Sequence, residues 1–549
     1  SLIKQSIMPF FSQNRENYVT TLAKLFEYAT DNYAKRPLSR FVEGGQEYTY
    51  DSFKHKCLEL SHRFNRFGIS ARDKVAILSN NMPNWTVAMF SCVPFGRVTV
   101  PILPDSSESE VTNIINHSEC KAIFVSKRLI KKLSQEVIDK LTLVIDIETF
   151  DFIKKDDKAF TCEGHGVDPQ ADDLASIIYT SGTSGKAKGV MLSHRNFCQN
   201  IIAAYHAQKA GKHDRWLSIL PMSHTYEMAF SVLYPLYVGG CVYYIQKPPT
   251  PSILMQTMKK VKPTIMCSVP LIIEKVYKSK IQKIVEKGGV KTLLKVPVID
   301  KMIQKKICGE LVSAFGGEFV EVIMGGAAFN KEIEKFFWDI AFPYTVGYGM
   351  TECAPIITYA HYDDKKLYSC GKAALNMSIR IDSTNPENIE GEIQAYGPNL
   401  ALGYYKNEEA TRSLFTEDGW LKTGDMGIID KDGYLYIRGR SKCMVLGPNG
   451  QNIYPEELES VINSFAYVVD SLVIEDNGGL TALVYPDYHL GELDGMNRED
   501  LEKTLRSQLP EMNKEIPNYA QIKKIEFMPE DFERTPKRSI KRYLYQRNK

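Results

Sequence analysis

The sequence has few features of a secreted, metal-binding or membrane-spanning protein. Its 549 residues include 11 cysteines, which are scattered singly and form no C-x-x-C pair. This pattern argues against a disulfide framework and a zinc site, and it favours a reducing, cytoplasmic compartment. The first residues, Ser1-Leu-Ile-Lys-Gln5, lack a signal-peptide layout. The longest apolar stretch, Trp85–Leu103, is interrupted by prolines, a glycine and an arginine, so we interpret it as a buried helix followed by a strand.

The chain also lacks a strong excess of charge of either sign. Its net charge of +2 gives no reason to expect nucleic acid as a partner. Residues 534–549 are an exception, because they contain several lysines and arginines and no acid. This segment is either a solvated basic tail or a group of cations that neutralises phosphates at a domain interface. Peripheral contact with anionic lipid at the inner membrane face also stays open.

The order of apolar segments predicts an α/β protein with more than one domain. Strand-like runs such as Lys74–Leu78 alternate with helical segments such as Glu108–Ser118, where Ser107 is the expected N-cap. This alternation favours layered, mostly parallel sheets. After about residue 375, short strands and turns predict a small β subdomain. We place the domain boundary at Gly439-Arg440-Ser441-Lys442, with a large N-terminal domain over 1–439 and a small, mobile α+β domain over 440–549.

The stretch Tyr179–Gly189 is rich in glycine and hydroxyl side chains and lies between two apolar runs. Such a loop suits phosphate binding, because glycines allow close approach while N–H groups, hydroxyls and lysines meet the oxygens. The spacing excludes a Walker P-loop, since only Thr183 and Ser184 separate Gly182 from Gly185. For an isolated loop of this composition, a flexible surface loop is the more frequent alternative.

Four further motifs follow this loop. Leu220–Glu227 contains a histidine and a glutamate three residues apart, on one face if the segment is helical. Gly325–Ala328 follows a strand and would let a flat ring lie against backbone. Gly347–Glu352 combines an aromatic ring, a hydroxyl and a carboxylate, which suit base stacking and Mg²⁺. Thr423–Asp425 offers a carboxylate for ribose hydroxyls. Taken singly, each also fits a structural histidine or an ordinary turn.

Together, in this order and spacing, the motifs resemble the adenylate-forming superfamily, which contains acyl-CoA synthetases, peptide-synthetase adenylation domains and beetle luciferases. The resemblance runs from about residue 25 to the C-terminus and includes Arg438–Lys442 and Gly450–Glu457. Within the superfamily, the chain looks most like bacterial long-chain fatty acid–CoA ligases. The resemblance therefore implies an AMP-forming acid–thiol ligase.

The resemblance implies two reaction steps that use ATP, Mg²⁺ and coenzyme A. A fatty carboxylate, of medium to long chain, first attacks the α-phosphorus of ATP to give an acyl adenylate and pyrophosphate. The thiol of coenzyme A then displaces AMP to give acyl-CoA. The first step depends more on charge neutralisation than on covalent chemistry.

The resemblance also implies roles for individual residues. Thr351 would contact the α-phosphate, Glu352 would hold Mg²⁺, and His224 would line the carboxylate end of the acyl pocket. Lys442 would be the hinge about which the small domain rotates between the two steps. The implied ATP/AMP-binding set is Thr180, Ser181, Gly182, Thr183, Ser184, Gly185 and Lys186 at the β- and γ-phosphates, Gly326, Ala327, Tyr348 and Gly349 around adenine, and Asp425 with Arg440 at the ribose.

One departure from the family pattern lies near the C-terminus. The family usually has Thr-Pro-x-Gly-Lys-Ile-x-Arg, whose lysine stabilises charge during adenylation. In this chain, Ser539 occupies the lysine position and Arg538 the glycine position. Lys537 or Lys541 could reach the site, Arg538 could supply the charge, or adenylation could be impaired. We favour a substitute cation, because the segment remains strongly basic.

Two other functions compete with a CoA ligase. An enzyme that loads a separate acyl carrier protein stays open. However, Met228-Ala-Phe230 offers no acid for a substrate amine, as an amino-acid-selecting pocket would. A non-catalytic nucleotide-binding protein is the third alternative. Ser539 favours it, whereas four residues of the family motifs argue against it: Glu352, Asp425, Arg440 and Lys442.

Overall fold

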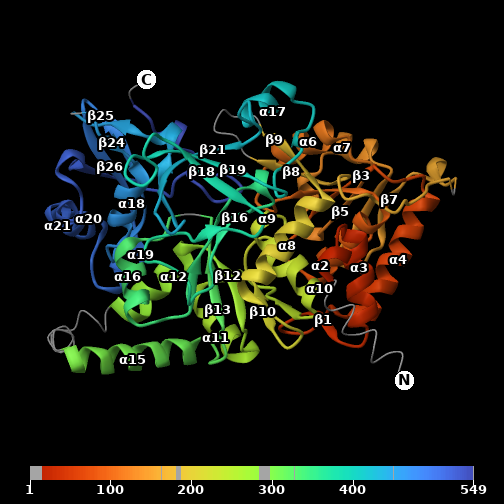
Figure 1. Cartoon of the computed structure of the whole chain (residues 1–549), viewed down its shortest axis with the longest axis horizontal. Helices are drawn as coiled ribbons and strands as arrows, with labels where there is room; N and C mark the ends of the chain where they lie inside the picture. Colours follow the sequence, from red (N-terminus) through yellow and green to blue (C-terminus); the bar gives the residue numbers. More distant parts are fainter. Residues whose placement is uncertain are drawn as a thin grey trace.

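The computed structural model describes residues 15–161, 163–180, 187–282, 297–326, 328–448 and 450–547. Two large sheets and their helices form the N-terminal domain, and the C-terminal elements, drawn in blue in Figure 1, form a separate smaller body beside it. The predicted α/β class with a large and a small domain is confirmed. Within the described residues, no helix has the length and hydropathy needed to cross a membrane.

The first large sheet is mostly parallel and is buried on both faces. Its strand order is β20 (Gly403–Tyr404), β9 (Lys188–Ser193), β8 (Leu174–Thr180), β4 (Val98–Ile102), β3 (Lys74–Leu78), β5 (Ala122–Val125), β6 (Leu143–Asp146) and β7 (Phe152–Lys155). β3 lies between β4 and β5, parallel to both. The near-continuous apolar runs of these strands suit a sheet that is covered on both sides. β9 returns antiparallel to β8, so Thr180 at the end of β8 lies opposite Lys188 at the start of β9.

The second large sheet is parallel except at one edge. Its strand order is β14 (Tyr344–Val346), β13 (Glu321–Met324), β12 (Ile265–Ser268), β10 (Arg215–Ser218), β11 (Cys241–Tyr244), β1 (Pro37–Phe41) and β2 (Glu47–Thr49). Only the β1–β2 pair is antiparallel among these described strands. The carboxyl ends of β12, β13 and β14 therefore lie at one edge, where ligands of such sheets bind.

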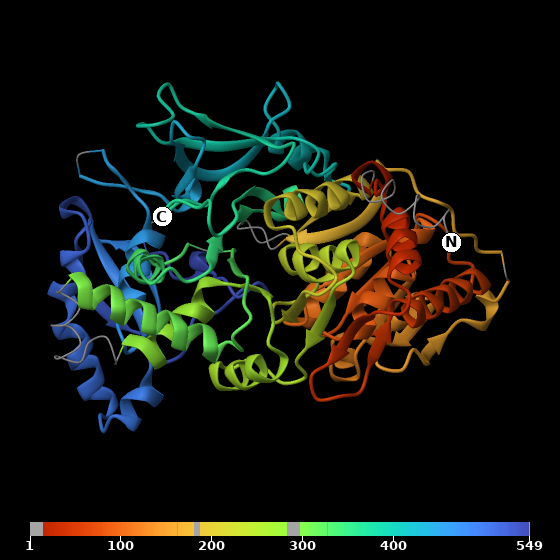
Figure 2. The ribbon, with the colours of Figure 1, turned by 60° about the horizontal axis from the view of Figure 1, so that its bottom comes forward.

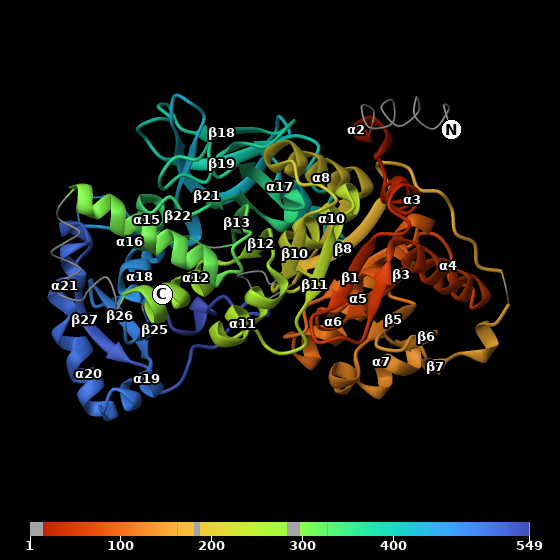
Figure 3. The same ribbon diagram turned by 90° about the horizontal axis from the view of Figure 1, so that it is seen from below.

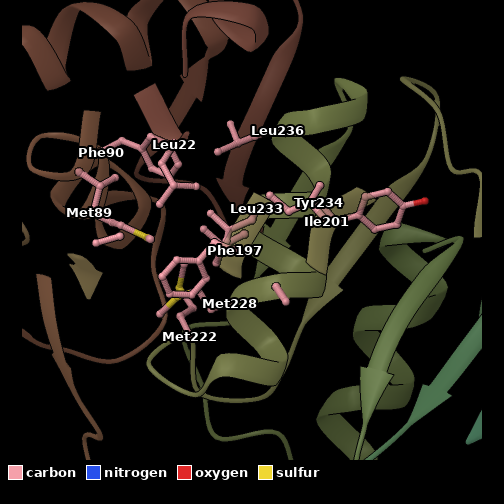
Figure 4. Close-up of a cluster of buried hydrophobic side chains, with 14 of the residues drawn as sticks. Leu22, Met89, Phe90, Phe197, Ile201, Met222, Met228, Leu233, Tyr234 and Leu236 are labelled. Atoms are coloured by element: carbon pink, nitrogen blue, oxygen red, sulfur yellow. The ribbon is translucent and has the colours of Figure 1, made fainter. Parts of the chain in front are cut away.

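Helices fill the space between the sheets and build the main core. They include α3 (Leu22–Asn32), α5 (Pro83–Phe90), α8 (His194–Gln208), α10 (Tyr234–Val238) and the π-helical segment η4 (Met228–Leu233). Figure 4 shows their side chains in contact, with Leu22 and Phe90 facing Phe197 and Leu233. Burial of this apolar surface is the main driving force for the layered packing.

Outer helices cover the remaining faces, and α6 among them begins where the sequence predicts. They are α2 (Arg15–Tyr18), α4 (Tyr50–Arg66), α6 (Glu108–Ser118), α7 (Gln135–Lys140), α11 (Pro251–Val261), α12 (Pro270–Val276), α15 (Pro297–Ala314) and α16 (Lys331–Asp339). Ser107 accepts a hydrogen bond from the N–H of Glu110 and caps α6, as expected. Trp85–Leu103 forms α5, a 3₁₀ turn and β4, which confirms the predicted buried helix and strand.

The small sheets complete the molecule. An antiparallel sheet of β18 (Ser378–Asp382), β19 (Gly391–Tyr396), β21 (Leu421–Ile429) and β22 (Leu435–Arg440) is the predicted β subdomain, at the top of Figure 2. A second contains β15 (Tyr348–Gly349), β16 (Ile356–Tyr359) and β17 (Lys372–Ala373). Helix α17 (Glu408–Leu414) packs beside β20.

The C-terminal domain packs helices on a three-stranded sheet. The three-stranded sheet consists of β25 (Val468–Asp476), β26 (Gly479–Pro486) and β27 (Ile522–Phe527). A separate pair of short strands is formed by β23 (Val445–Leu446) and β24 (Asn452–Ile453). The helices of the domain are α18 (Pro455–Asn463), α19 (Tyr488–Leu493), α20 (Arg498–Ser507) and α21 (Leu509–Lys514). This mixture of helices and strands agrees with the α+β class expected for the C-terminal domain, although the individual strand β27 was not predicted.

Candidate active site

The loop that follows β15 carries Thr351 and Glu352, both buried, in a 3₁₀ turn, η6 (Thr351–Cys353). Asn200 of α8 holds this loop. Its Nδ2 donates to the Cys353 carbonyl (3.1 Å), and its Oδ1 accepts from the Ile356 N–H (2.8 Å). The loop also folds tightly on itself, because a Cβ at Gly349 would lie 2.0 Å from the carbonyl oxygen of Pro355. Glycine is therefore required at 349 by a close backbone approach.

The Glu352 carboxylate accepts a hydrogen bond from a distant strand. The hydroxyl of Tyr404, from β20, donates to its Oε2 at 3.3 Å. Burial raises the pKa of Glu352, while the positive charges of Lys537 and Arg440 oppose that shift. The carboxylate, which lies near two cations, therefore still has oxygen lone pairs with which it can accept a ligand. Tyr404 could not be found from the sequence, since nothing in its local pattern marks it.

Lys537 reaches this loop from the C-terminal domain. Its Nζ donates to Thr351 Oγ1 at 3.1 Å. Lys537 lies in a tight turn in which the Arg538 N–H donates to the Thr535 carbonyl and the Thr535 N–H to the Ser539 carbonyl, both at 2.8 Å. Burial lowers the pKa of Lys537, and the nearby Glu352 charge opposes this shift. The turn thus presents one cation to the residues expected at the phosphates.

Ion pairs on either side hold this turn against its own domain. Arg534 Nη2 lies 2.7 Å from Asp470 Oδ2 on β25, and Arg542 pairs with the buried Glu459 of α18. The other two candidate cations lie elsewhere. Lys541 pairs with Glu533 (3.0 Å) and Arg538 with Asp105 (3.1 Å). Of the cations considered for the missing family lysine, the structure brings only Lys537 to Thr351 within the described residues.

Asp425, Tyr348 and Arg440 lie together at the edge of the β subdomain. The Tyr348 hydroxyl donates to Asp425 Oδ2 (2.5 Å), and Arg440 Nη1 lies 3.6 Å from Asp425 Oδ1. Asp425 and Arg440 are cross-strand partners on β21 and β22, which explains their proximity. Burial raises the pKa of Asp425, and the Arg440 charge opposes it. The predicted ribose residues are therefore assembled around one carboxylate.

His224 is not on one helix face with Glu227, so the helical alternative for Leu220–Glu227 is wrong. His224 is the N-cap of a single turn, α9 (Thr225–Glu227), and its Nδ1 accepts from the Tyr226 N–H at 3.2 Å. Burial and the Lys537 charge lower the pKa of His224 to about 3, so the ring is neutral at pH 7. Because Nδ1 is an acceptor, the ring proton is on Nε2. Glu227 instead accepts from the Leu220 N–H (2.8 Å) in the core.

The two glycine-containing turns are placed at sheet edges. Gly326 has a φ of +82° two residues after β13, and Tyr226 packs against the neighbouring Gly325. Thr180 ends β8 and pairs with Lys188, whose Nζ lies 5.2 Å from the ring centre of Tyr404. The start of β9 thus approaches Glu352 through Tyr404. Seven predicted nucleotide-binding residues lie outside the described residues: Ser181, Gly182, Thr183, Ser184, Gly185, Lys186 and Ala327.

The expected hinge directly follows β22. That strand continues to Arg440, and Lys442 lies in a 3₁₀ turn, η7 (Ser441–Cys443), with an exposed side chain. Ser441 Oγ donates to the Gly424 carbonyl at 3.2 Å, which fixes the start of this turn to the β subdomain. The connection between the domains therefore begins beside the Asp425 cluster.

The metal-binding groups near Glu352 suit an Mg²⁺ ion that is held partly by the protein and partly by the substrate. In the described ranges, no three His, Cys, Asp or Glu side chains are grouped so as to hold a metal ion by themselves. Mg²⁺ commonly binds through one or two carboxylates together with phosphate oxygens and water. The buried carboxylate of Glu352, with its acceptor capacity, suits this arrangement.

Comparison with solved structures identifies the fold as that of adenylate-forming enzymes. The ATP-bound MatB from Rhodopseudomonas palustris superposes with a TM-score of 0.74 at 23% identity, over 95% of this chain and 98% of that one. The AMP complex of O-succinylbenzoate Coenzyme A Synthetase (MenE) from Bacillus subtilis gives a TM-score of 0.74 at 20% identity, over 95% and 97% of the two chains. At these identities the likeness concerns the fold alone.

Comparison with protein-family models shows the family to which the chain belongs. The AMP-binding enzyme model matches residues 26–405, and the AMP-binding enzyme C-terminal domain model matches residues 443–548. The chain therefore belongs to the AMP-binding enzyme family, and the predicted adenylate-forming acid–thiol ligase is confirmed. Long-chain-fatty-acid--CoA ligase FadD15 of Mycobacterium tuberculosis is 29% identical over 451 residues, 74% of this chain and 72% of the relative. Long-chain-fatty-acid--CoA ligase ACSBG2 of Gallus gallus is 26% identical, over 84% and 67% respectively.

Proposed function

We propose that the chain activates a fatty carboxylic acid, of medium to long chain, with ATP and transfers the acyl group to coenzyme A. The names of its curated relatives support the substrate class. The observation that supports catalysis most strongly is the contact of Lys537 with Thr351 beside Glu352. It offers an adenylation cation although the family's usual lysine position is Ser539.

In the first half-reaction, the carboxylate oxygen attacks the α-phosphorus of ATP and pyrophosphate leaves. Lys537 and the Thr351 hydroxyl stabilise the charge that develops on the α-phosphate oxygens. The neutral His224 donates from Nε2 toward the acyl carboxylate end. The β- and γ-phosphates are held by Thr180 and the residues 181–186. The adenine is enclosed by Gly326, Ala327, Tyr348 and Gly349. Glu352 would hold Mg²⁺, which neutralises phosphate charge when bound.

In the second half-reaction, the thiolate of coenzyme A attacks the acyl carbonyl and AMP leaves. The part of the C-terminal domain that follows the hinge Lys442 rotates relative to residues 1–439, which withdraws Lys537 from Thr351. Asp425 and Arg440 stay with the N-terminal domain and keep the ribose in place. The enzyme works in the cytoplasm, with peripheral contact at the inner membrane face where fatty acids partition.

ATP–pyrophosphate exchange over a panel of carboxylic acids tests this proposal. Exchange should peak with medium- or long-chain fatty acids, and addition of coenzyme A should convert the bound adenylate to acyl-CoA. If ATP–pyrophosphate exchange occurs but no CoA thioester forms, and the acyl group is instead transferred to an acyl carrier protein, the acceptor is the carrier protein and not coenzyme A. Absence of exchange with every acid would instead leave a non-catalytic nucleotide-binding protein.

A further inference from the structure

Lys278 of the N-terminal domain is inserted into the C-terminal domain. It lies in a π turn, η5 (Tyr277–Ile281), that continues α12, and Figures 1 and 3 place α12 beside α18. Its Nζ donates to the carbonyl of Asn463, to that of Phe465 at 3.0 Å and to that of Val468 at 3.2 Å. These carbonyls belong to the last residue of α18, to the turn that follows it and to the first residue of β25. All three donor positions of the ammonium are therefore used across the domain interface.

This position suits a cation for two reasons. The last carbonyls of a helix have no partner within the helix, and the helix dipole makes its C-terminus electronegative. Glu274, one helical turn before Lys278, and Asp470 of the C-terminal domain add negative charge on both sides. Burial nevertheless lowers the pKa of Lys278 to about 8, so desolvation offsets part of this attraction. A contact with modest net free energy suits an interface that forms and breaks in every cycle.

A second contact reinforces the same end of α18. Asn330, the N-cap of α16, donates from Nδ2 to the carbonyl of Ser460, and its own N–H donates to Glu274 Oε1 at 3.1 Å. Glu274 of α12 thus links Asn330 to the helix that continues into η5, where Lys278 lies. The N-terminal domain holds α18 at two points one turn apart.

The contact at α18 continues to the turn that carries Lys537. Asn463 Nδ2 donates to Asp470 Oδ1 at 3.1 Å, and Asp470 Oδ2 pairs with Arg534 at 2.7 Å. Arg534 Nη1 in turn donates to the Arg538 carbonyl at 3.0 Å, next to Lys537. The corner bound by Lys278 and the turn that presents Lys537 therefore belong to one connected hydrogen-bond network.

We propose that Lys278 is a positioning residue that selects the domain orientation in which Lys537 reaches Thr351. It acts by capping the C-terminus of α18 from the other domain, and so favours adenylation over thioester formation. This inference rests on the proposed function for its catalytic consequence, but the interdomain contact itself does not depend on the substrate.

Lys278→Met is the direct test, with Lys275→Met as the matched control. Lys275 lies three residues earlier on α12 and is exposed. We expect Lys278→Met to slow ATP–pyrophosphate exchange about tenfold, within the range of usual coupling between sites. Thioester formation from added acyl adenylate should be unchanged or faster. Equal slowing of both half-reactions, or equal effects of the two substitutions, would overturn the proposal. Lys278→Arg, which keeps the charge and the donors, should recover most of the exchange rate.

A double-mutant cycle separates positioning from a general loss of stability. In a Lys537→Ala background, Lys278→Met should cause no further loss of exchange, because the effect acts through Lys537. An additive loss would show that Lys278 acts independently and would contradict the inference.

Hydrogen exchange keeps the test independent of activity. In the ligand-free protein, Lys278→Met should speed amide exchange in residues 460–470 and in α12, relative to Lys275→Met. Unchanged exchange in both segments would refute the interdomain contact. If the wild-type chain activates no acid but Lys278→Met accelerates amide hydrogen exchange as expected, the proposed function fails while the interdomain contact stands.

Discussion

The ammonium of Lys537 lies 3.1 Å from the hydroxyl of Thr351, although 186 residues separate them in the chain. The contact joins the C-terminal domain to the loop that carries Glu352. It occurs two residues before Ser539, the position at which the motif that the sequence resembles implies a lysine. The hairpin turn at Thr535–Ser539 therefore presents a cation from a different position of the same segment.

The first prediction tests whether the cation has moved along this turn. Lys537→Ala should slow adenylation about 10²-fold, as removal of one transition-state donor typically does. Lys541→Ala should stay within about twofold of the wild type, because its ammonium pairs with Glu533. Adding Ser539→Lys to Lys537→Ala should restore part of the rate in an ATP–pyrophosphate exchange assay. Equal losses in the two alanine variants would contradict this assignment.

The second prediction concerns backbone strain at Arg538. Its φ is +68°, a left-handed conformation that costs a residue with a Cβ about 1 kcal/mol. The surface pair with Asp105 is exposed and offsets little of this cost. Arg538→Gly should therefore be more stable than Arg538→Ala by about 1 kcal/mol in denaturant unfolding, since both variants lose the pair and only glycine relieves the strain. Equal stabilities would argue against strain at this turn.

The third prediction concerns the tight loop at Gly349. A Cβ there would lie 2.0 Å from the Pro355 carbonyl, so Gly349→Ala must displace the loop that carries Thr351 and Glu352. A shift of about 1 Å at reacting groups can cost roughly 10²-fold in rate. Gly309→Ala is the control, because a Cβ at this position of α15 would meet no described atom within 4 Å. We expect adenylation to be lost in the first variant and kept in the second.

The fourth prediction concerns the pH dependence of stability. Burial raises the pKa of Glu227 to about 8, so the folded chain keeps a proton that the unfolded chain releases above its ordinary pKa. Stability must then fall as pH rises from about 4.5 to about 8. Glu227→Gln cannot ionise, and it should gain on the order of a few kcal/mol relative to the wild type across that window. Urea unfolding from pH 5 to pH 8.5, with the exposed Glu499→Gln as control, measures the difference. A constant difference across the range would contradict a buried, protonated Glu227.

Much of the fold could be predicted from local patterns. The capped start of α6 at Ser107 and the apolar runs of β3 and β4 are local features, and the structure has them as expected. The edge strand β27 was missed because its apolar residues are interrupted by lysines on a half-exposed strand. The conformation of His224 was also not predictable, since a buried carboxylate, Glu227, bends the segment back onto Leu220.

The site could be predicted only as a set of motifs. Their order in the chain suggested Thr351, Glu352 and Asp425, but the contacts that hold them come from distant residues. Asn200 and Tyr404 act through tertiary packing and carry no local signal. Sequence spacing could not decide which of Lys537, Arg538 and Lys541 supplies the adenylation cation, because that depends on the side of the turn from which each side chain projects.

A single-turnover measurement of both half-reactions tests the central claim most directly. Wild-type protein, ATP, Mg²⁺ and a labelled long-chain fatty acid should form acyl-AMP, and coenzyme A added later should convert it to acyl-CoA. Lys537→Ala should form acyl-AMP about 10²-fold more slowly, yet convert supplied acyl-AMP to acyl-CoA at the wild-type rate. Unimpaired acyl-AMP formation in Lys537→Ala would contradict the role of this lysine, and absence of acyl-AMP in the wild type would contradict the ligase itself.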